Sequence, residues 1–147
     1  MLRLVYNILM EWTEDLAVGI TKIDEQHREL FKRIHNLLLA IREHRCKAEI
    51  DETIRFLDDY ARFHFSEEEM RMEEAGYKGL QEHKLQHAIY LENIAELKQQ
   101  AALPRESGMS YELSVTATQI VVDWIVAHIM KTDKLFGAYL KGHRPDY

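Results

Sequence analysis

Apolar side chains recur at intervals of three and four residues through most of the chain, and this pattern constrains the fold more than any other feature. Such spacing places the apolar residues on one side of an α-helix. No segment alternates polar and apolar residues over a useful length, so the sequence contains no pattern typical of a half-buried strand. We therefore predict an all-α protein with four main helices. These helices are expected over residues 21–44, 49–74, 79–102 and 110–131, with a short C-terminal helix through Phe136, Ala138 and Leu140.

The expected helices are joined by short connections, which favour antiparallel neighbours. The economical architecture is an antiparallel up-down-up-down four-helix bundle. A chain of 147 residues is long enough for one domain with its own core. We expect a single domain over residues 1–147, in which residues 21–141 form the helical bundle and residues 1–20 form an N-terminal arm laid across it.

The composition bears on partners and location. The net charge of −6 argues against nucleic acid, because phosphate binding needs a basic face. No apolar run approaches the length needed to span a bilayer, and the apolar start of the chain lacks the cleavage signal of a secretory leader. The lone Cys46 has no partner for an intramolecular disulfide, which fits a reducing compartment. These features predict a cytoplasmic protein that binds neither nucleic acid nor membrane.

Several ionisable residues fall on helix positions that are otherwise filled by leucine, isoleucine and valine. An unpaired buried carboxylate costs several kcal/mol or must take up a proton, so a bundle that buries such groups has to compensate them. A bound cation provides this compensation. The residues concerned are His27, His64, Glu68, His83, His87 and His128.

The spacing of these residues supports a metal site. An offset of four returns to within about 40° of the same helix face, so His64 with Glu68 can chelate one site, as can His83 with His87. His128 is followed by Asp133 at an offset of five, which diverges by about 140° in a regular α-helix. Asp133 can join the site if the helix bulges there, a distortion common at functional sites, or if it approaches a two-metal centre from another direction.

These residues offer five imidazoles and two carboxylates. A tetrahedral zinc ion needs four ligands, so seven donors imply two metal ions. Imidazoles with bridging carboxylates suit a pair of iron ions best, although zinc and manganese stay open. The Glu-x-x-His pairs of carboxylate-rich di-iron bundles do not occur in this sequence. A histidine-rich site has fewer anionic donors to stabilise high-valent iron, which favours reversible oxygen binding over oxygen activation.

The ordered fragments "HFSEE", "HKLQH" and "HIMKTD" carry a family resemblance. Together with the flanking "IDEQHRELF" and "DWIVAHIMKTDKLFGAYL", they resemble the hemerythrin family, in particular its single-domain bacterial members. The resemblance extends from about residue 10 to residue 141.

Membership of this family implies a di-iron centre. One iron would be held by His83, His87 and His128, and the other by His27 and His64. Glu68 and Asp133 would bridge the two irons, together with an oxide or hydroxide. The two-histidine iron would keep an open position, where dioxygen binds end-on.

An apolar lining around such a site would exclude the water and added protons that drive its autoxidation. Five residues next to the expected ligands are candidates for this oxygen pocket, with plain core packing as the alternative. They are Leu30, Phe65, Trp124, Ile125 and Ile129. We expect His35, His44 and His143 to face solvent, and Glu67 and Glu69 to lie on a solvated helix face.

Three functions compete for such a chain. The first is a non-enzymatic protein that stores, buffers or delivers dioxygen. The second is an oxygen or redox sensor, which needs a separate protein partner that the sequence does not identify. The third is a di-iron enzyme that reduces peroxide or nitric oxide or oxidises ferrous iron. We favour reversible dioxygen binding without enzymatic turnover.

Overall fold

A computed structural model describes residues 12–102 and 118–142, and every regular element in these two ranges is helical. The first is a short 3₁₀ turn, η1 (Glu14–Leu16). Three long helices follow, α2 (Thr21–Arg42), α3 (Lys47–Glu74) and α4 (Leu80–Ala102). The fourth helical segment, residues 118–142, consists of the π-helical turn η2 (Thr118–Asp123), α6 (Trp124–His128), the π-helical turn η3 (Ile129–Asp133) and α7 (Lys134–Gly142).

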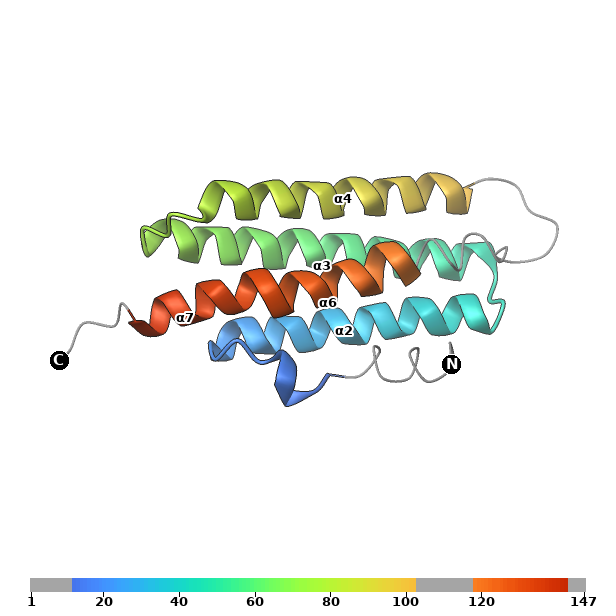
Figure 1. Ribbon diagram of the computed structural model, residues 1–147. Coiled ribbons are helices and arrows are strands. Elements are labelled where there is room, and N and C mark those ends of the chain that lie inside the picture. The colour runs from blue at the N-terminus through green and yellow to red at the C-terminus, as the bar shows by residue number, and fades with distance from the viewer. Residues whose placement is uncertain (1–11, 103–117, 143–147) are drawn as a thin grey trace.

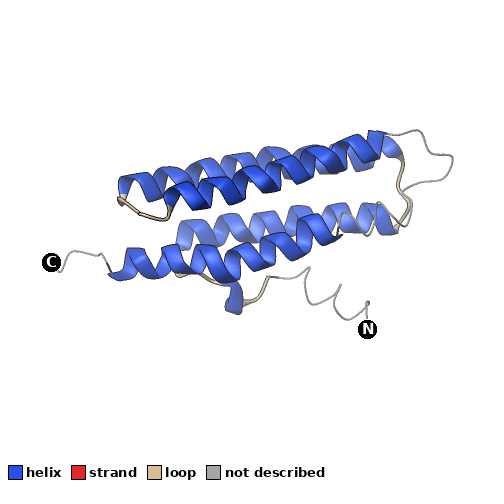
Figure 2. Ribbon diagram, turned by 45° about the horizontal axis from the view of Figure 1, so that its top comes forward, coloured by secondary structure: helices blue, strands red, loops and turns tan. Residues whose placement is uncertain are grey.

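The four segments run side by side along one long axis (Figures 1 and 2). α3 packs between α2 and α4, and the fourth segment closes the bundle because η2 contacts both α4 and α2. The predicted all-α four-helix bundle is therefore confirmed. The predicted short C-terminal helix is α7, which follows η3 without a break. The expected start of the fourth helix at residue 110 lies outside the described residues.

The turns between the helices explain their limits. His44, just after α2, has φ 52°, and Gly76, just after α3, has φ 65°; both conformations are left-handed and end a helix. Before α2, the carboxylate of Asp24 accepts hydrogen bonds from the backbone N–H groups of Val18 at 2.8 Å and Gly19 at 3.2 Å. This acidic side chain in the first turn holds the preceding loop against the helix start.

Residues 12–20 of the expected arm lie against the bundle. The indole of Trp12 packs edge-on against Phe31 of α2, with ring centroids 6.1 Å apart. A Cβ built on Gly137 of α7 would lie 2.3 Å from the carbonyl oxygen of Val18, so the loop and α7 approach as closely as only glycine permits. Residues 1–11 lie outside the described part.

The bundle core is apolar over most of its length, with one exception toward the end where α2 begins, α3 ends and α4 begins. Of the buried polar residues in the described ranges, Asp58 is paired with Lys98 and Arg62. The others gather at one place, and they are Gln26, His27, His64, Glu68, His83, His87, His128 and Asp133.

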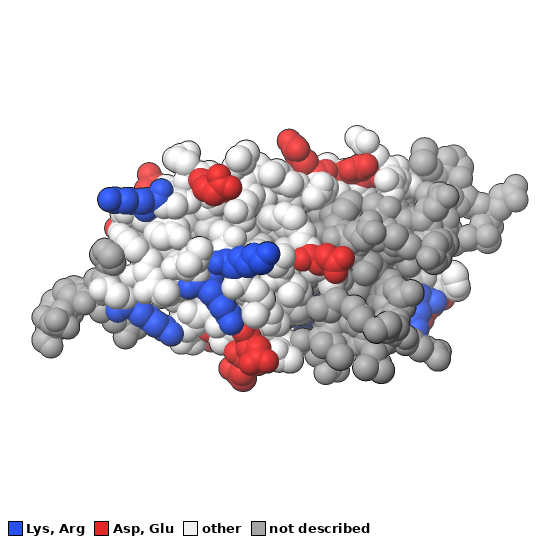
Figure 3. Space-filling model, viewed as in Figure 1, with Lys and Arg blue, Asp and Glu red and all other residues white. Residues whose placement is uncertain are grey.

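The outer surface carries charges of both signs. Figure 3 shows acidic and basic side chains interspersed over the described part of one face. Among the helices that the structure describes, none is both long and apolar enough to cross a membrane.

Candidate metal centre

The structure brings all seven predicted metal ligands together in the bundle interior. They form two groups that share Glu68 and Asp133, and within each group the potential ligand atoms lie within 4.8 Å of one another. The three-histidine pocket contains Glu68, His83, His87, His128 and Asp133. The two-histidine pocket contains His27, His64, Glu68 and Asp133.

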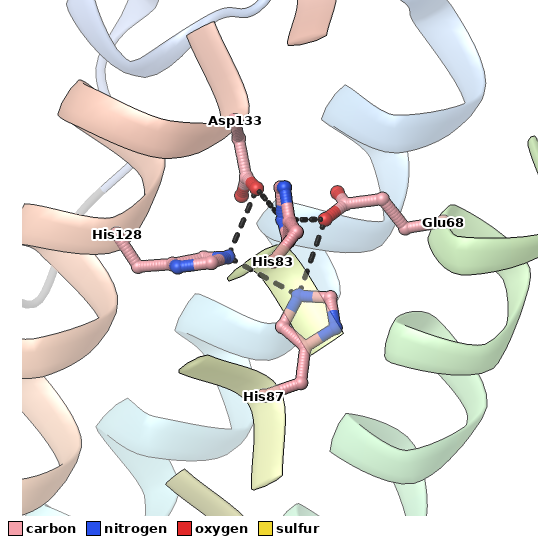
Figure 4. Close-up of side chains that lie close together, drawn as sticks. All are labelled: Glu68, His83, His87, His128 and Asp133. Carbon is pink, nitrogen blue, oxygen red and sulfur yellow. Dashed lines mark hydrogen bonds and ion pairs between the residues drawn. The ribbon is translucent and has the colours of Figure 1, made fainter. Parts of the chain in front are cut away.

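In the three-histidine pocket, imidazole nitrogens and carboxylate oxygens point toward one another (Figure 4). Oε1 of Glu68 lies 2.7 Å from Nε2 of His83 and 3.3 Å from Nε2 of His87. Oδ1 of Asp133 lies 2.9 Å from Nε2 of His83 and 3.0 Å from Nε2 of His128. α3, α4 and the fourth helical segment therefore each contribute to one compact set of nitrogen and oxygen donors.

The two-histidine pocket uses the other oxygen of each carboxylate. Oδ2 of Asp133 lies 3.1 Å from Nε2 of His27. Oε2 of Glu68 lies 3.5 Å from Nε2 of His64 and 3.9 Å from Nε2 of His27. Each carboxylate thus presents one oxygen to each pocket, which is the arrangement of a ligand that bridges two cations.

A π-helical turn solves the problem of the five-residue offset between His128 and Asp133. The backbone N–H of Lys134 donates to the carbonyl oxygen of Ile129, five residues earlier, instead of four as in an α-helix. This wider turn brings residues five apart to one side of the helix. It is the bulge that the sequence requires if Asp133 is to share a site with His128.

The outer nitrogens of three of these histidines donate to side chains on neighbouring helices. Nδ1 of His64 donates to Gln26 at 2.8 Å. Nδ1 of His87 donates to the carboxylate of Glu69 at 2.8 Å, and Nδ1 of His128 donates to Gln86 at 2.9 Å. Such bonds fix the imidazole orientation and are typical of metal-bound histidine.

Sequence reasoning missed these three acceptors, and its placement of Glu69 on a solvated face is wrong. The Glu69 side chain is only 26% exposed because it turns toward His87 on α4. The one signal in the sequence is position. Gln26, Glu69 and Gln86 each stand directly beside an expected ligand, where a polar side chain can reach the adjacent helix.

The same hydrogen bonds place unshared electron pairs inside the site. A neutral imidazole that donates from Nδ1 carries its lone pair on Nε2. His87 and His128 both donate from Nδ1, yet their Nε2 atoms lie 3.2 Å apart. Two facing lone pairs repel, and a cation between them removes the repulsion.

The carboxylate oxygens indicate a cation as well. None of the four oxygens of Glu68 and Asp133 makes an aligned hydrogen bond in the described part of the chain, although imidazole nitrogens approach closely. The imidazole nitrogens and carboxylate oxygens of each pocket therefore point toward a common centre and not directly at one another. This donor set of imidazole nitrogens and carboxylate oxygens fits two adjacent cations of the imidazole-preferring transition metals.

Electrostatics in the absence of metal agree with this interpretation. Burial and then the neighbouring His128 lower the pKa of His87 to about 2, and burial and His27 lower the pKa of His64 well below its ordinary value. Both imidazoles are therefore neutral, the form that binds metal. Burial alone would lower the pKa of His83, but the Asp133 and Glu68 carboxylates outweigh it and raise this pKa to about 9.

The pKa values of the two carboxyl groups shift in opposite directions. Burial, reinforced by the nearby Asp133, raises the pKa of Glu68 well above its ordinary value. Burial acts in the same direction on Asp133, but His128 and the other surrounding imidazoles outweigh it and hold its pKa well below the ordinary value. Two carboxylates this close do not both ionise readily without a cation between them.

A sequence model described as Hemerythrin HHE cation binding domain matches residues 18–140, which is most of the chain. The chain belongs to the hemerythrin family. The resemblance found in the sequence is therefore confirmed.

Individual relatives cover nearly the same length. The chain is 31% identical over 135 residues to a bacteriohemerythrin of Stenotrophomonas maltophilia, covering 92% of this chain and 84% of the relative. It is 32% identical over 133 residues to a bacteriohemerythrin of Methylococcus capsulatus, covering 90% and 97%. A solved wild-type hemerythrin has a TM-score of 0.75 at 28% identity, covering 88% of this chain and 95% of that one.

Aromatic rings support the metal-facing imidazoles of this hemerythrin. Phe65 stacks on His87 with ring centroids 3.9 Å apart and planes at 9°. Trp124 stacks on His128 at 4.6 Å and 12°, and its other side stacks on Tyr90 at 4.5 Å. Of the five expected lining residues, Phe65 and Trp124 therefore contact the three-histidine pocket directly.

The other expected lining residues, Leu30, Ile125 and Ile129, are buried in the core. Tyr90 is an unexpected neighbour, because its ring is fully buried and its hydroxyl has no hydrogen-bond partner in the described ranges. Of the remaining histidines, His44 is exposed and His35 is half-buried, while His143 lies outside the described residues.

Proposed function

We propose that this hemerythrin is a non-haem di-iron protein that binds dioxygen reversibly and is not an enzyme. The observation that carries the proposal is that Glu68 and Asp133 each direct one oxygen into each of the two histidine pockets. A single metal ion would use only one side of this arrangement. Two ions bridged by both carboxylates use all seven donors.

We assign the ligands by pocket. One iron would be held by His83, His87 and His128, and the other by His27 and His64. Glu68 and Asp133 would serve both irons, together with a solvent-derived oxide or hydroxide.

The unequal pockets supply a place for dioxygen. The three-histidine pocket offers five side-chain donors and the two-histidine pocket offers four. With a shared bridging oxygen, the first set fills six positions, whereas the second leaves one position free. An iron pair held there would supply the two electrons that reversible dioxygen binding requires, and the pocket of His27 and His64 would leave room for the ligand, which we expect to bind end-on.

The protein surroundings favour release over further reaction. Leu30, Ile125 and Ile129 are each at most 1% exposed, so the interior around the ligands is apolar and excludes water. We assign Leu30, Phe65, Trp124, Ile125 and Ile129 to the lining of the oxygen site. Five of the seven donors are imidazoles, which leaves little anionic charge to stabilise high-valent iron.

The relatives support the same function, since their names identify them as bacteriohemerythrins and, in Theromyzon tessulatum, as a myohemerythrin that is 27% identical over 123 residues. Storage, buffering or delivery of dioxygen in the cytoplasm is the role that we assign to this chain. Dioxygen is the partner in this proposal, and neither nucleic acid nor a membrane is required.

Repeated oxygen cycling tests the proposal. Iron-loaded protein is reduced without oxygen, exposed to air and returned to an oxygen-free atmosphere while its visible spectrum is recorded. A charge-transfer band that appears with air and disappears without it supports reversible binding. Irreversible conversion by air would contradict it and favour a redox sensor, while steady turnover of peroxide or nitric oxide with a reductant would favour an enzyme.

A further inference from the structure

We propose that Glu69 is a positioning residue that makes the three-histidine pocket bind its metal ion first and more tightly than the two-histidine pocket. The inference rests on the proposed two-metal site and adds an order of loading to it. Glu69 does not face the site itself. It acts through His87, whose Nδ1 donates to Oε1 of Glu69 at 2.8 Å.

The acceptors behind the histidines differ in charge between the pockets. Glu69 supplies a carboxylate behind His87, with its Oε1 2.8 Å from Nδ1 of that imidazole. Hydrogen bonds to an ionised acceptor are roughly twice as strong as those between neutral groups. A carboxylate behind an imidazole also makes its inner nitrogen a stronger metal donor. In the two-histidine pocket, His64 has only the neutral amide of Gln26 behind it.

A second histidine in each pocket differs in whether its outer nitrogen has a hydrogen-bond partner. His128 donates to Gln86, whose oxygen also accepts from the hydroxyl of Thr132 at 3.0 Å, so this amide is held from two sides. Nδ1 of His27 has no hydrogen-bond partner in the described residues. The imidazole of His27 is therefore the less constrained of the two.

Ring stacking adds to this asymmetry. His87 and His128 each lie flat against an aromatic ring, Phe65 and Trp124 respectively, with interplanar angles of 9° and 12°. His64 meets Phe65 at 50°, and His27 meets Trp12 at 38° with centroids 6.4 Å apart. His87 and His128 are thus held in place before metal arrives, which reduces the entropy lost on binding, whereas Nδ1 of His83 has no hydrogen-bond partner in the described residues.

The shared carboxylates then make loading ordered. The first ion in the three-histidine pocket takes up charge from Glu68 and Asp133, so the second ion meets carboxylates that are already partly neutralised. The pocket with more donors and better-held histidines therefore fills first, and the two-histidine pocket fills second and empties first.

Titration of the metal-free chain with cobalt(II) under oxygen-free conditions tests this order. Calorimetry gives the affinities, and visible absorption reports the ligand set of each bound ion. Wild-type protein is expected to bind two ions in two resolved steps. Glu69→Gln keeps a hydrogen-bond acceptor but removes its charge, and should weaken the first step by about 10-fold, within the range for groups behind a ligand. The second step should change much less.

Three further variants separate charge from position. Glu69→Met removes both the acceptor and the charge, and should weaken the first step more than Glu69→Gln does. Gln26→Glu places a carboxylate behind His64. It should raise the affinity of the second step and so reduce the difference in affinity between the two steps. Glu67→Gln, a charge change on the same helix away from the histidines, should alter neither step. Circular dichroism of each metal-free variant confirms that it is folded.

The possible outcomes distinguish the inference from the proposal beneath it. If Glu69→Gln leaves the affinity of both steps unchanged, or lowers only that of the second step, the role of Glu69 is refuted. The two-metal site would remain intact in either case. Binding of one ion or none by wild-type protein would instead overturn the two-metal site.

Discussion

The substitution Glu68→Gln is expected to have opposite effects on metal-loaded and metal-free protein. Glu68 is fully buried, and it directs one oxygen to each pocket. Glutamine has nearly the same shape, but its amide nitrogen has no lone pair for a metal. The side chain at position 68 of the variant therefore contacts the metal ion of one pocket only, and it carries no charge.

The loss in loaded protein can be estimated from binding. A metal present at a thousandfold excess over its dissociation constant stabilises the folded state by about 4.1 kcal/mol per site. If removal of one bridging oxygen weakens a site about 100-fold, the free energy of unfolding falls by about 2.7 kcal/mol. For a chain of this size, that corresponds to a fall in Tm of about 5–11 °C.

Metal-free protein should respond differently. Burial and Asp133 raise the pKa of Glu68, so without metal this carboxyl already resists ionisation, and a neutral amide replaces it at little cost. We expect the Tm of the metal-free variant to equal or exceed that of wild-type protein. Thermal unfolding followed by circular dichroism, with iron and after chelation, measures both values.

The neighbouring substitution Glu67→Gln is the matched control and should leave both Tm values nearly unchanged. If Glu68→Gln destabilises metal-free and loaded protein equally, Glu68 is a structural residue and not a metal ligand. The reasoning from its two pockets would then be refuted.

Three other substitutions test separate parts of the structure. His27→Ala should remove the metal ion of the two-histidine pocket and the oxygen-dependent spectrum while the fold is kept; metal analysis and visible spectra check this, and an unchanged spectrum would count against the ligand assignment. Tyr90→Phe removes a buried hydroxyl without a partner and should stabilise the protein by up to about 1–3 kcal/mol in urea unfolding, whereas a clear loss of stability would reveal an interaction of that hydroxyl. Gly137→Ala should destabilise by about 1–3 kcal/mol because its Cβ would meet the carbonyl oxygen of Val18. Gly142→Ala, whose Cβ has open space, is the control for that change and should be neutral or stabilising.

The sequence predicted the helices well because each one must bury a continuous apolar stripe. α3 was expected over residues 49–74 and spans Lys47–Glu74, and α2 ends two residues before the expected 44. The candidate ligands were recognisable for the complementary reason, since a histidine or glutamate interrupts such a stripe only when something compensates it.

Other features depend on contacts between helices, which periodicity does not encode. Glu69 is one residue from Glu68 and so points about 100° away around its own helix. Its role becomes visible only when α4 brings His87 to it. The sequence indicated the π-helical turn before Lys134 only indirectly, because His128 and Asp133 are five residues apart and reach one site only across a bulge. A local bulge produces no other recognisable pattern in the sequence.

Crystals of iron-loaded protein, with diffraction data collected on both sides of the iron absorption edge, test the two-metal site most directly. Two anomalous peaks should lie between Glu68 and Asp133, roughly 3–4 Å apart, one beside His83, His87 and His128 and the other beside His27 and His64. A single peak, or peaks away from the two carboxylates, would contradict the assignment of these residues to a di-iron centre.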